Sequence, residues 1–476
     1  MAENYWSGRK SDEEFDPISS FLSEFSSPEE EEEEFRSDFF EGLAGRRRKA
    51  AFVLMSIWAI TITLHLVSWG YWVIVGVTGL IGIQTIRFVT AKPESSPQPL
   101  RERELVCAPK VSLLVAAKNE QAVIADLVKT LCTLDYPVDK YEVWAIDDRS
   151  TDRTPVILDR LAQEYPHLKV VHRPANAGGG KSGALNQVLP RTQGEILGVF
   201  DADARVPKDL LRRVIPFFND PQIGAVQVTK EIANAQENFW TKGQGAEMAL
   251  DSYVQQQRIA VGGIGELRGN GQFVRRSALK SCGCWNEETI TDDLDLTIRL
   301  HLDDWKIGFL LTPTVREEGV TSAIALWHQR NRWAEGGYQR YLDYWRFILR
   351  SRMGLGKKID LLAFVLLQYL LPTAAIPDLV MGITRHRLPI YSPLSGLLVS
   401  LAFWSMFQGL IRTRTDEKLN FSNLVKICWQ TLRGMVYMIH WQVVMPSITA
   451  RMSVRPKRLK WVKTVHEGTG QESFEF

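Results

Sequence analysis

The stretch Glu195-Ile-Leu-Gly-Val-Phe-Asp-Ala-Asp203 joins a short apolar segment directly to two aspartates, and it indicates the class of the fold. Its first six residues have the length and apolar character of a buried β-strand. Strand-like and helix-like segments alternate before it, at 111–117, 121–134, 141–146 and 153–165. Such alternation is typical of an α/β domain with a parallel sheet, in which ligands bind beyond the carboxyl ends of the strands. We therefore expect the acids that follow these strands to share one edge of the sheet.

The whole chain is longer than one ordinary domain, and its charge is unevenly distributed. Its 476 residues suit two or three structural units of about 100–200 residues each. Residues 11–41 contain thirteen acidic side chains and one basic one, so this segment carries −12 and the rest of the chain +14, against +2 overall. We expect residues 1–45 to form a disordered acidic tail. A basic body is typical of proteins that bind nucleic acid or an anionic membrane surface.

Long apolar segments predict two membrane-spanning hairpins. Residues 50–86 carry no charged side chain and directly follow the basic run Arg46–Lys49. Because one span needs about 20 apolar residues, we interpret 50–89 as a transmembrane hairpin, with one long tilted helix as the alternative. A second hairpin is predicted at 361–411, where Asp378 is the one acidic residue.

Two further segments are predicted to lie at the membrane surface. Residues 336–358 carry aromatic and arginine side chains at helical spacing, which favours an interfacial amphipathic helix, with a core helix as the alternative. A fifth span at 424–450 would place the basic C-terminal tail across the membrane from Arg46–Lys49. The positive-inside tendency therefore favours an interfacial or re-entrant segment and basic tail over 424–476, and a cytoplasmic α/β domain at 110–335.

Acidic motifs at the strand ends carry the predicted chemistry. Asp201 and Asp203 directly follow the strand of the opening stretch, and Asp147 and Asp148 follow the strand before residue 147. Carboxylate oxygens are the ligands that Mg²⁺ and Mn²⁺ prefer, commonly together with phosphate oxygens of a substrate. The sequence therefore predicts a divalent cation at this edge.

A glycine-rich segment, Asn176-Ala-Gly-Gly-Gly-Lys-Ser-Gly-Ala-Leu-Asn186, resembles a phosphate-binding loop at first sight. The Walker pattern requires a glycine where Ala175 stands, and a strand immediately before the loop. We therefore exclude an ATPase loop and expect Lys181 to face a diphosphate from a flexible turn.

Two later motifs add a candidate base and a candidate anion-binding group. Asp292 and Asp293 open an amphipathic helix, where acids suit the helix dipole; the functional alternative is a general base held close to an acceptor hydroxyl. Gln329, Arg332 and Trp333 end the α/β domain. Arginine forms charge-assisted bonds to phosphate, and the indole offers an apolar face to a sugar or a lipid.

Taken in order, these motifs resemble the family 2 glycosyltransferases of GT-A fold, in the membrane-bound group that includes the cellulose and hyaluronan synthases. Val115–Glu120 resembles the nucleotide-binding turn, Asp147 and Asp148 the uridine-binding acids, and Asp201 with Asp203 the motif for metal and donor sugar. The chain departs from the family at three places, with Lys118 for tyrosine, Arg149 for glycine and Asp292 for glutamate.

The resemblance also implies roles for individual residues. Asp293 would be the catalytic base, with Asp292 in support. The donor would be bound by Asn119, Glu120, Asp148, Lys181 and Asp201, the acceptor and diphosphate by Gln329, Arg332 and Trp333, and the metal by Asp201 and Asp203.

The resemblance further implies an inverting transfer from a UDP-sugar that uses Mg²⁺, with Mn²⁺ as an alternative. Four predicted spans leave little room for a polymer channel, which favours a lipid acceptor. The whole chain, with its acidic tail and paired hairpins, is similar to cyanobacterial lipid glucosyltransferases of this family. That similarity implies UDP-glucose as donor, 1,2-diacylglycerol as acceptor, and a multi-pass protein of the plasma or thylakoid membrane.

Three other functions are weighed against this one. A processive polysaccharide synthase of the cellulose or hyaluronan type is the main alternative. A non-enzymatic scaffold does not explain the intact acidic motifs, and a nucleic-acid-binding protein explains neither these acids nor the spans.

Overall fold

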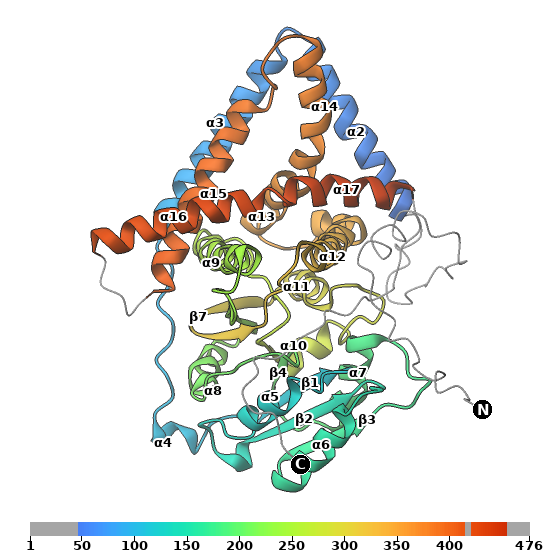
Figure 1. Cartoon of the computed structure of the whole chain (residues 1–476), viewed down its shortest axis with the longest axis vertical. Helices are drawn as coiled ribbons and strands as arrows, with labels where there is room; N and C mark the ends of the chain where they lie inside the picture. Colours follow the sequence, from blue (N-terminus) through green and yellow to red (C-terminus); the bar gives the residue numbers. More distant parts are fainter. Residues whose placement is uncertain (1–45, 415–419, 455–476) are drawn as a thin grey trace, which may run out of the picture.

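The computed structural model of this protein describes residues 46–414 and 420–454. The tail predicted at 1–45, and residues 455–476 of the predicted basic tail, lie outside the described residues. Figure 1 shows an α/β domain and, above it, a group of long helices that converge at the top of the view.

Seven strands form one sheet in the order β3-β2-β1-β4-β6-β5-β7. Their bounds are β1 Val111–Ala117, β2 Tyr141–Asp147, β3 Leu168–His172, β4 Ile196–Phe200, β5 Ile223–Ile232, β6 Gln272–Arg275 and β7 Lys306–Glu317. The α/β class is confirmed, but the expectation of a purely parallel sheet is wrong, because β6 runs antiparallel to both β4 and β5. Strand β6 has four residues and follows the long helix α9 (Phe239–Ala260), after which the chain returns through the sheet in the opposite direction.

Helices cover both faces of the sheet, because successive side chains of a strand point to opposite faces. In β1, Leu113 and Val115 pack into one core with α5 and α6, whereas Leu114 packs into a second core with α7 and α11. The helices of the domain, apart from α9 and the later α12, are α4 Glu102–Leu105, α5 Ile124–Leu131, η1 Val138–Lys140, α6 Thr154–Glu164, α7 Gly180–Val188, η2 Leu189–Arg191, α8 Leu210–Val214, η3 Ile215–Asn219, α10 Arg276–Ser281 and α11 Asp292–Leu302.

Among the described residues, four helices are long and apolar enough to cross a membrane. They are α2 Arg46–Leu66, α3 Gly70–Thr90, the continuous helix Leu355–Thr384 and α15 Ser392–Arg412. The third comprises α13 Leu355–Val365, the π-helical segment η4 Leu366–Leu370 and α14 Leu371–Thr384. They form two pairs, α2 packed on α14 and α3 on α15, and the two pairs converge at the top of Figure 1.

A buried polar cluster joins the two hairpins near the end of α2 at Leu66. His65 Nε2 lies 2.7 Å from Asp378 Oδ1, and this carboxylate also accepts hydrogen bonds from the backbone N–H groups of Ile390 and Tyr391. Polar groups inside a membrane are costly unless they are paired. Because Asp378 is fully surrounded by donors, it links the hairpins rather than disrupting its helix.

The segments predicted at the membrane surface lie in α12, the first residues of α13, α16 and α17. Helix α12 extends over Ala323–Arg350. Most of its side chains from 334 to 344 are buried, so the first part of 336–358 is a core helix, while Trp345, Phe347 and Leu349 are exposed. The segment 424–450 is divided between α16 (Phe421–Met438) and α17 (Trp441–Val454). These helices cross the view below the converging hairpins and above the α/β domain (Figure 1).

Candidate active site

The topology brings all three acidic motifs to one cavity of about 2300 Å³. Asp201 and Asp203 follow β4, Asp148 follows β2, and Asp292 and Asp293 form the first turn of α11. Asn119 and Asp147 do not line this cavity, and Asp147 instead accepts a hydrogen bond from the N–H of Ser150 and contacts His172. The other site residues predicted from the sequence line it: Glu120, Asp148, Lys181, Asp201, Asp203, Asp292, Asp293, Gln329, Arg332 and Trp333.

Asn119 instead stabilises the turn that carries Glu120. Its backbone adopts a left-handed φ of 55°. Its side-chain oxygen accepts a hydrogen bond of 2.7 Å from the backbone N–H of Thr151, and its own N–H donates to the Ser150 hydroxyl. These bonds join the loop after β1 to the loop after β2. Asn119 therefore fixes the loop that carries Glu120 and does not itself line the cavity.

Asp148 is held by an arginine that the sequence motifs did not indicate. Arg173 is buried and donates through Nη1 to Asp148 Oδ1 at 2.7 Å and to the carbonyl of Gly180, while Nη2 donates to the carbonyl of Gly178. Arg173 follows β3 and precedes the glycine-rich loop. It therefore ties the acid after β2 to the loop that carries Lys181.

Lys181 lies among the carboxylates of the cavity. Its Nζ is 2.5 Å from Asp201 Oδ1. Burial alone would lower the pKa of this ammonium group, but the surrounding carboxylates, Asp201 foremost, outweigh burial and raise it. Lys181 is therefore cationic throughout the physiological range. It is the second residue of α7, whose N-cap is Gly179 with a φ of 76°.

Asp293 has the properties of a general base. Its Oδ1 accepts a hydrogen bond of 2.8 Å from the N–H of Leu294. Burial, and next the charge of Asp292, raise the pKa of Asp293 to about 6. A β-carbon placed on Gly269, whose φ is 78°, would lie 3.4 Å from Asp293 Oδ2 and 4.0 Å from Asp201 Oδ2. The absence of a side chain at Gly269 therefore keeps open the space between the candidate base and the candidate metal ligand.

The carboxylates that follow β4 suit a hard cation only with help from a substrate. Asp203 Oδ2 accepts a hydrogen bond of 3.0 Å from the N–H of Glu318, which orients it, and both Asp201 and Asp203 line the cavity. Within residues 46–414 and 420–454, no three His, Cys, Asp or Glu side chains gather closely enough to hold a metal ion. Mg²⁺ typically binds through one or two carboxylates plus substrate phosphates, and the residues fit that pattern.

The motif that ends the α/β domain connects it to the helices above. Arg330 is fully buried, lies 4.0 Å from the ring of Trp333 and pairs with Glu247 of α9 at 2.5 Å. Glu247 also accepts a hydrogen bond of 2.8 Å from the indole N–H of Trp441 on α17. Arg332 lines the cavity, where burial lowers its pKa. Glu247 and Trp441 were missed in the sequence because neither belongs to a local motif.

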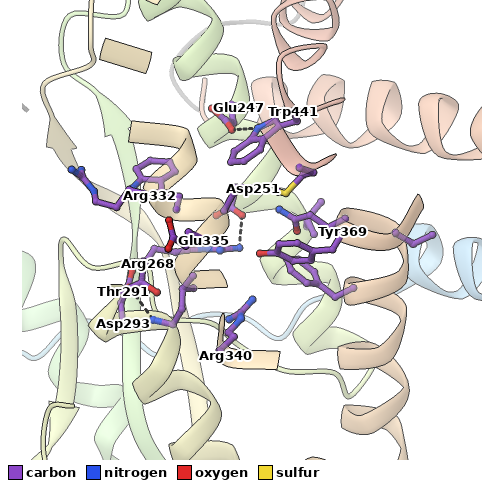
Figure 2. A pocket seen from close by; sticks show the side chains of 18 of the residues that line it. Glu247, Asp251, Arg268, Thr291, Asp293, Arg332, Glu335, Arg340, Tyr369 and Trp441 are labelled. Atoms are coloured by element: carbon purple, nitrogen blue, oxygen red, sulfur yellow. Dashed lines mark hydrogen bonds and ion pairs between the residues drawn. The ribbon is translucent and has the colours of Figure 1, made fainter. Parts of the chain in front are cut away.

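The same cavity continues upward between the long helices. Its upper walls carry mostly apolar side chains of α3, of the helix Leu355–Thr384 and of α15, for example Ile83, Leu367, Ala375 and Leu398. Figure 2 shows side chains from both parts of the cavity in one view, with Asp293 of α11 below Trp441 and Tyr369 of the upper helices. The cavity is therefore polar at the sheet edge and apolar between the hairpins.

Comparisons with known proteins identify the family. Residues 109–336 match the model of the family described as glycosyltransferase like family 2. The chain is 59% identical over 469 residues to the β-monoglucosyldiacylglycerol synthase of a Synechocystis species, covering 98% of both chains. It is 60% identical over 472 residues to the synthase of the same name from a Nostoc species, covering 99% of this chain and 100% of that one.

A solved structure supports the fold. The mannosyltransferase of Pyrobaculum calidifontis, determined in complex with GDP-mannose and Mn²⁺, has a TM-score of 0.50 at 22% identity, over 80% of this chain and 98% of that one. Together with the full-length identities, these matches identify the protein as an enzyme. The chain belongs to the family 2 glycosyltransferases, in the group of the β-monoglucosyldiacylglycerol synthases.

Proposed function

We propose that this enzyme transfers glucose from UDP-glucose to the free hydroxyl of 1,2-diacylglycerol and forms a β-linked monoglucosyl lipid. The observation that carries the proposal is the single cavity that extends from Asp293 to the space between the apolar hairpins. A two-chain lipid can bring its hydroxyl to the base while its acyl chains stay among apolar helices. The names of the two full-length relatives support the same acceptor and sugar.

The residues of the site account for each part of the transfer. Asp293, with a pKa of about 6, is largely deprotonated at neutral pH and takes the proton of the acceptor hydroxyl. The hydroxyl oxygen attacks the anomeric carbon from the face opposite the diphosphate. The bond from that carbon to the diphosphate oxygen breaks, and its electron pair leaves with UDP. Attack from the opposite face converts an α-linked donor into a β-linked product.

Fixed positive charge stabilises the departing diphosphate. Lys181 and Arg332 line the cavity on the side of Asp201, and preorganised charge in such a site lowers the barrier to charge separation. We propose that Asp201 and Asp203, with diphosphate oxygens, hold Mg²⁺, or Mn²⁺ as the alternative. Such a cation, when bound, neutralises charge on the leaving group. Glu120 and Asp148 would face the nucleoside end.

We further propose that the α/β domain lies on the cytoplasmic side of the plasma or thylakoid membrane. The basic run Arg46–Lys49 begins α2 at the end of the hairpin nearer to this domain. The positive-inside tendency favours the cytoplasmic side for such a run. Cys107 is exposed on the domain. In right-side-out vesicles this thiol should not react with a membrane-impermeant thiol reagent, and it should react once the vesicles are opened. Reaction in sealed vesicles would indicate the opposite orientation of the domain.

The proposal is tested with membranes that contain this protein. They are incubated with diacylglycerol, Mg²⁺ and, in separate reactions, labelled UDP-glucose, UDP-galactose and UDP-N-acetylglucosamine. We expect a chloroform-soluble lipid that carries one glucose. Long water-soluble chains would instead support the processive polysaccharide synthase, and absence of transfer from every donor would refute the proposed reaction.

A further inference from the structure

A cluster of buried charged and phenolic side chains lies where the polar and apolar parts of the cavity meet. Arg268 and Arg340 line the cavity here, and Tyr369 reaches it from the long helix of the second hairpin. In Figure 2 the Tyr369 hydroxyl points toward the ion pair of Asp251 and Arg268, with Asp293 and Arg340 below them. Asp251, Arg268, Arg340 and Tyr369 belong to none of the motifs found in the sequence.

The charges within this cluster balance. Glu266 is fully buried and pairs with Arg340 at 3.1 Å, Arg268 at 2.9 Å and Arg258 at 3.3 Å. Two further carboxylates, of Asp251 and Asp360, pair with Arg268 and Arg258. Three guanidinium groups thus face three carboxylates, so the cluster presents hydrogen-bond donors without a net positive charge.

Several donors of the cluster have no acceptor within the described part of the chain. Arg340 is 3% exposed, and its Nε and Nη1 have no hydrogen-bond partner there. Tyr369 is also 3% exposed; the described residues provide no hydrogen-bond acceptor for its hydroxyl. Buried donors in native proteins are nearly always satisfied, so such unpaired groups at a cavity wall indicate a ligand that supplies acceptors.

The backbone places the Tyr369 hydroxyl against α12. Tyr369 belongs to the π-helical segment Leu366–Leu370, and π-helical turns inside α-helices are frequent at functional sites. A β-carbon on Gly337 would lie 2.1 Å from the Tyr369 hydroxyl oxygen and 3.6 Å from Leu294. The hydroxyl therefore packs against α12 at Gly337, on the side of that glycine where the side chain of Leu294 also lies.

We propose that Arg340 and Tyr369 donate hydrogen bonds to the two ester carbonyl oxygens of diacylglycerol and thereby hold its free hydroxyl at Asp293. This subsite rests on the proposed function, because it assigns the part of the acceptor that lies between the reacting hydroxyl and the acyl chains. A neutral cluster of donors matches neutral carbonyl oxygens; a lipid phosphate would require excess positive charge. The subsite therefore selects a neutral diacyl lipid.

The first test compares two acceptors that differ only in the carbonyl groups. The full-length enzyme in detergent micelles is supplied with UDP-glucose and either 1,2-dioleoylglycerol or its ether analogue, 1,2-dioleylglycerol, which has no ester carbonyls. We expect kcat/KM to be at least roughly tenfold lower for the ether lipid, the size expected for lost hydrogen bonds. Equal kcat/KM for the two lipids would overturn the subsite while leaving the proposed function intact. Transfer to neither lipid would remove the proposed function itself.

Variants then assign the discrimination to individual residues. Tyr369→Phe and Arg340→Lys should each lower kcat/KM for the ester lipid by roughly tenfold, chiefly by raising KM. Their kcat/KM for the ether lipid should be nearly unchanged. Arg340→Lys keeps a positive charge beside Glu266. Tyr338→Phe is the matched control, because Tyr338 stacks on Tyr369, also has an unpaired buried hydroxyl, and does not line the cavity. Equal losses on both lipids would contradict the assignment, and the comparison of lipids on the unmodified enzyme stands even where a variant does not fold.

Discussion

The two ends of the cavity are built in different ways. At the sheet edge, most functional side chains belong to short motifs that directly follow strands or open a helix, as Asp201 and Asp203 do after β4. Between the hairpins, Glu247, Tyr369 and Trp441 come from three helices far apart in the chain. Parallel strand topology places the first set automatically, whereas the packing of helices places the second. Chemistry at the sheet edge is therefore locally encoded, and recognition of the acceptor depends on the tertiary structure.

The largest expected effect separates catalysis at the sheet edge from binding. Asp293→Asn removes the base and keeps the shape of the side chain, so kcat should fall by about 10²- to 10⁴-fold with little change in UDP binding by calorimetry. Asp303→Asn is the control, because Asp303 is an exposed acid at the other end of α11. Full activity of Asp293→Asn would reject the assigned base.

The difference between the two ends also explains what the sequence could predict. The strand 111–117 and the acids after β4 were found because a short apolar run followed by polar residues defines them locally. The burial of the first part of 336–358 was not evident from the sequence, because it depends on the packing of α12 against α11 and α17, which a periodic pattern does not reveal. The bond from Trp441 to Glu247 joins residues 194 positions apart, and no spacing in the sequence marks it.

The second prediction concerns the stability of the upper end. Glu247→Leu leaves the fully buried guanidinium of Arg330 without its carboxylate, and breaking a buried pair costs about 3–5 kcal/mol. The control is Glu231→Leu, which removes the more exposed ion pair with Arg316, typically worth about 0–1 kcal/mol. We expect thermal unfolding to show a much larger loss for Glu247→Leu. Equal losses would mean that α9 and α17 are held together by other contacts.

The third prediction returns to the sheet edge and to the metal. Asp203→Asn removes one of the two proposed carboxylate ligands and keeps the hydrogen-bond acceptor for Glu318. The Mg²⁺ concentration needed for half-maximal transfer should rise by roughly 10- to 100-fold, and excess Mg²⁺ should restore much of the activity. KM for diacylglycerol should stay unchanged, since the proposed acceptor subsite at Arg340 and Tyr369 is unaltered. A rise in that KM without a change in Mg²⁺ dependence would contradict the assignment.

The smallest expected effect is a shift in pH dependence, and it tests how the charges at the sheet edge influence one another. A base must be deprotonated to act, so kcat/KM should fall as pH decreases below the pKa of Asp293, about 6. Asp292 contributes to this value because its negative charge disfavours a second carboxylate beside it, which raises the pKa of Asp293. Asp292→Asn removes that charge, so the acid limb should move to lower pH, by roughly half a unit to one unit. Tyr369→Phe, which alters the proposed acceptor subsite and removes no charge beside Asp293, should lower kcat/KM for diacylglycerol without moving the limb. A limb that moves in Tyr369→Phe and stays fixed in Asp292→Asn would mean that the titrating group belongs to the acceptor end, and the division between the two ends would have to be redrawn.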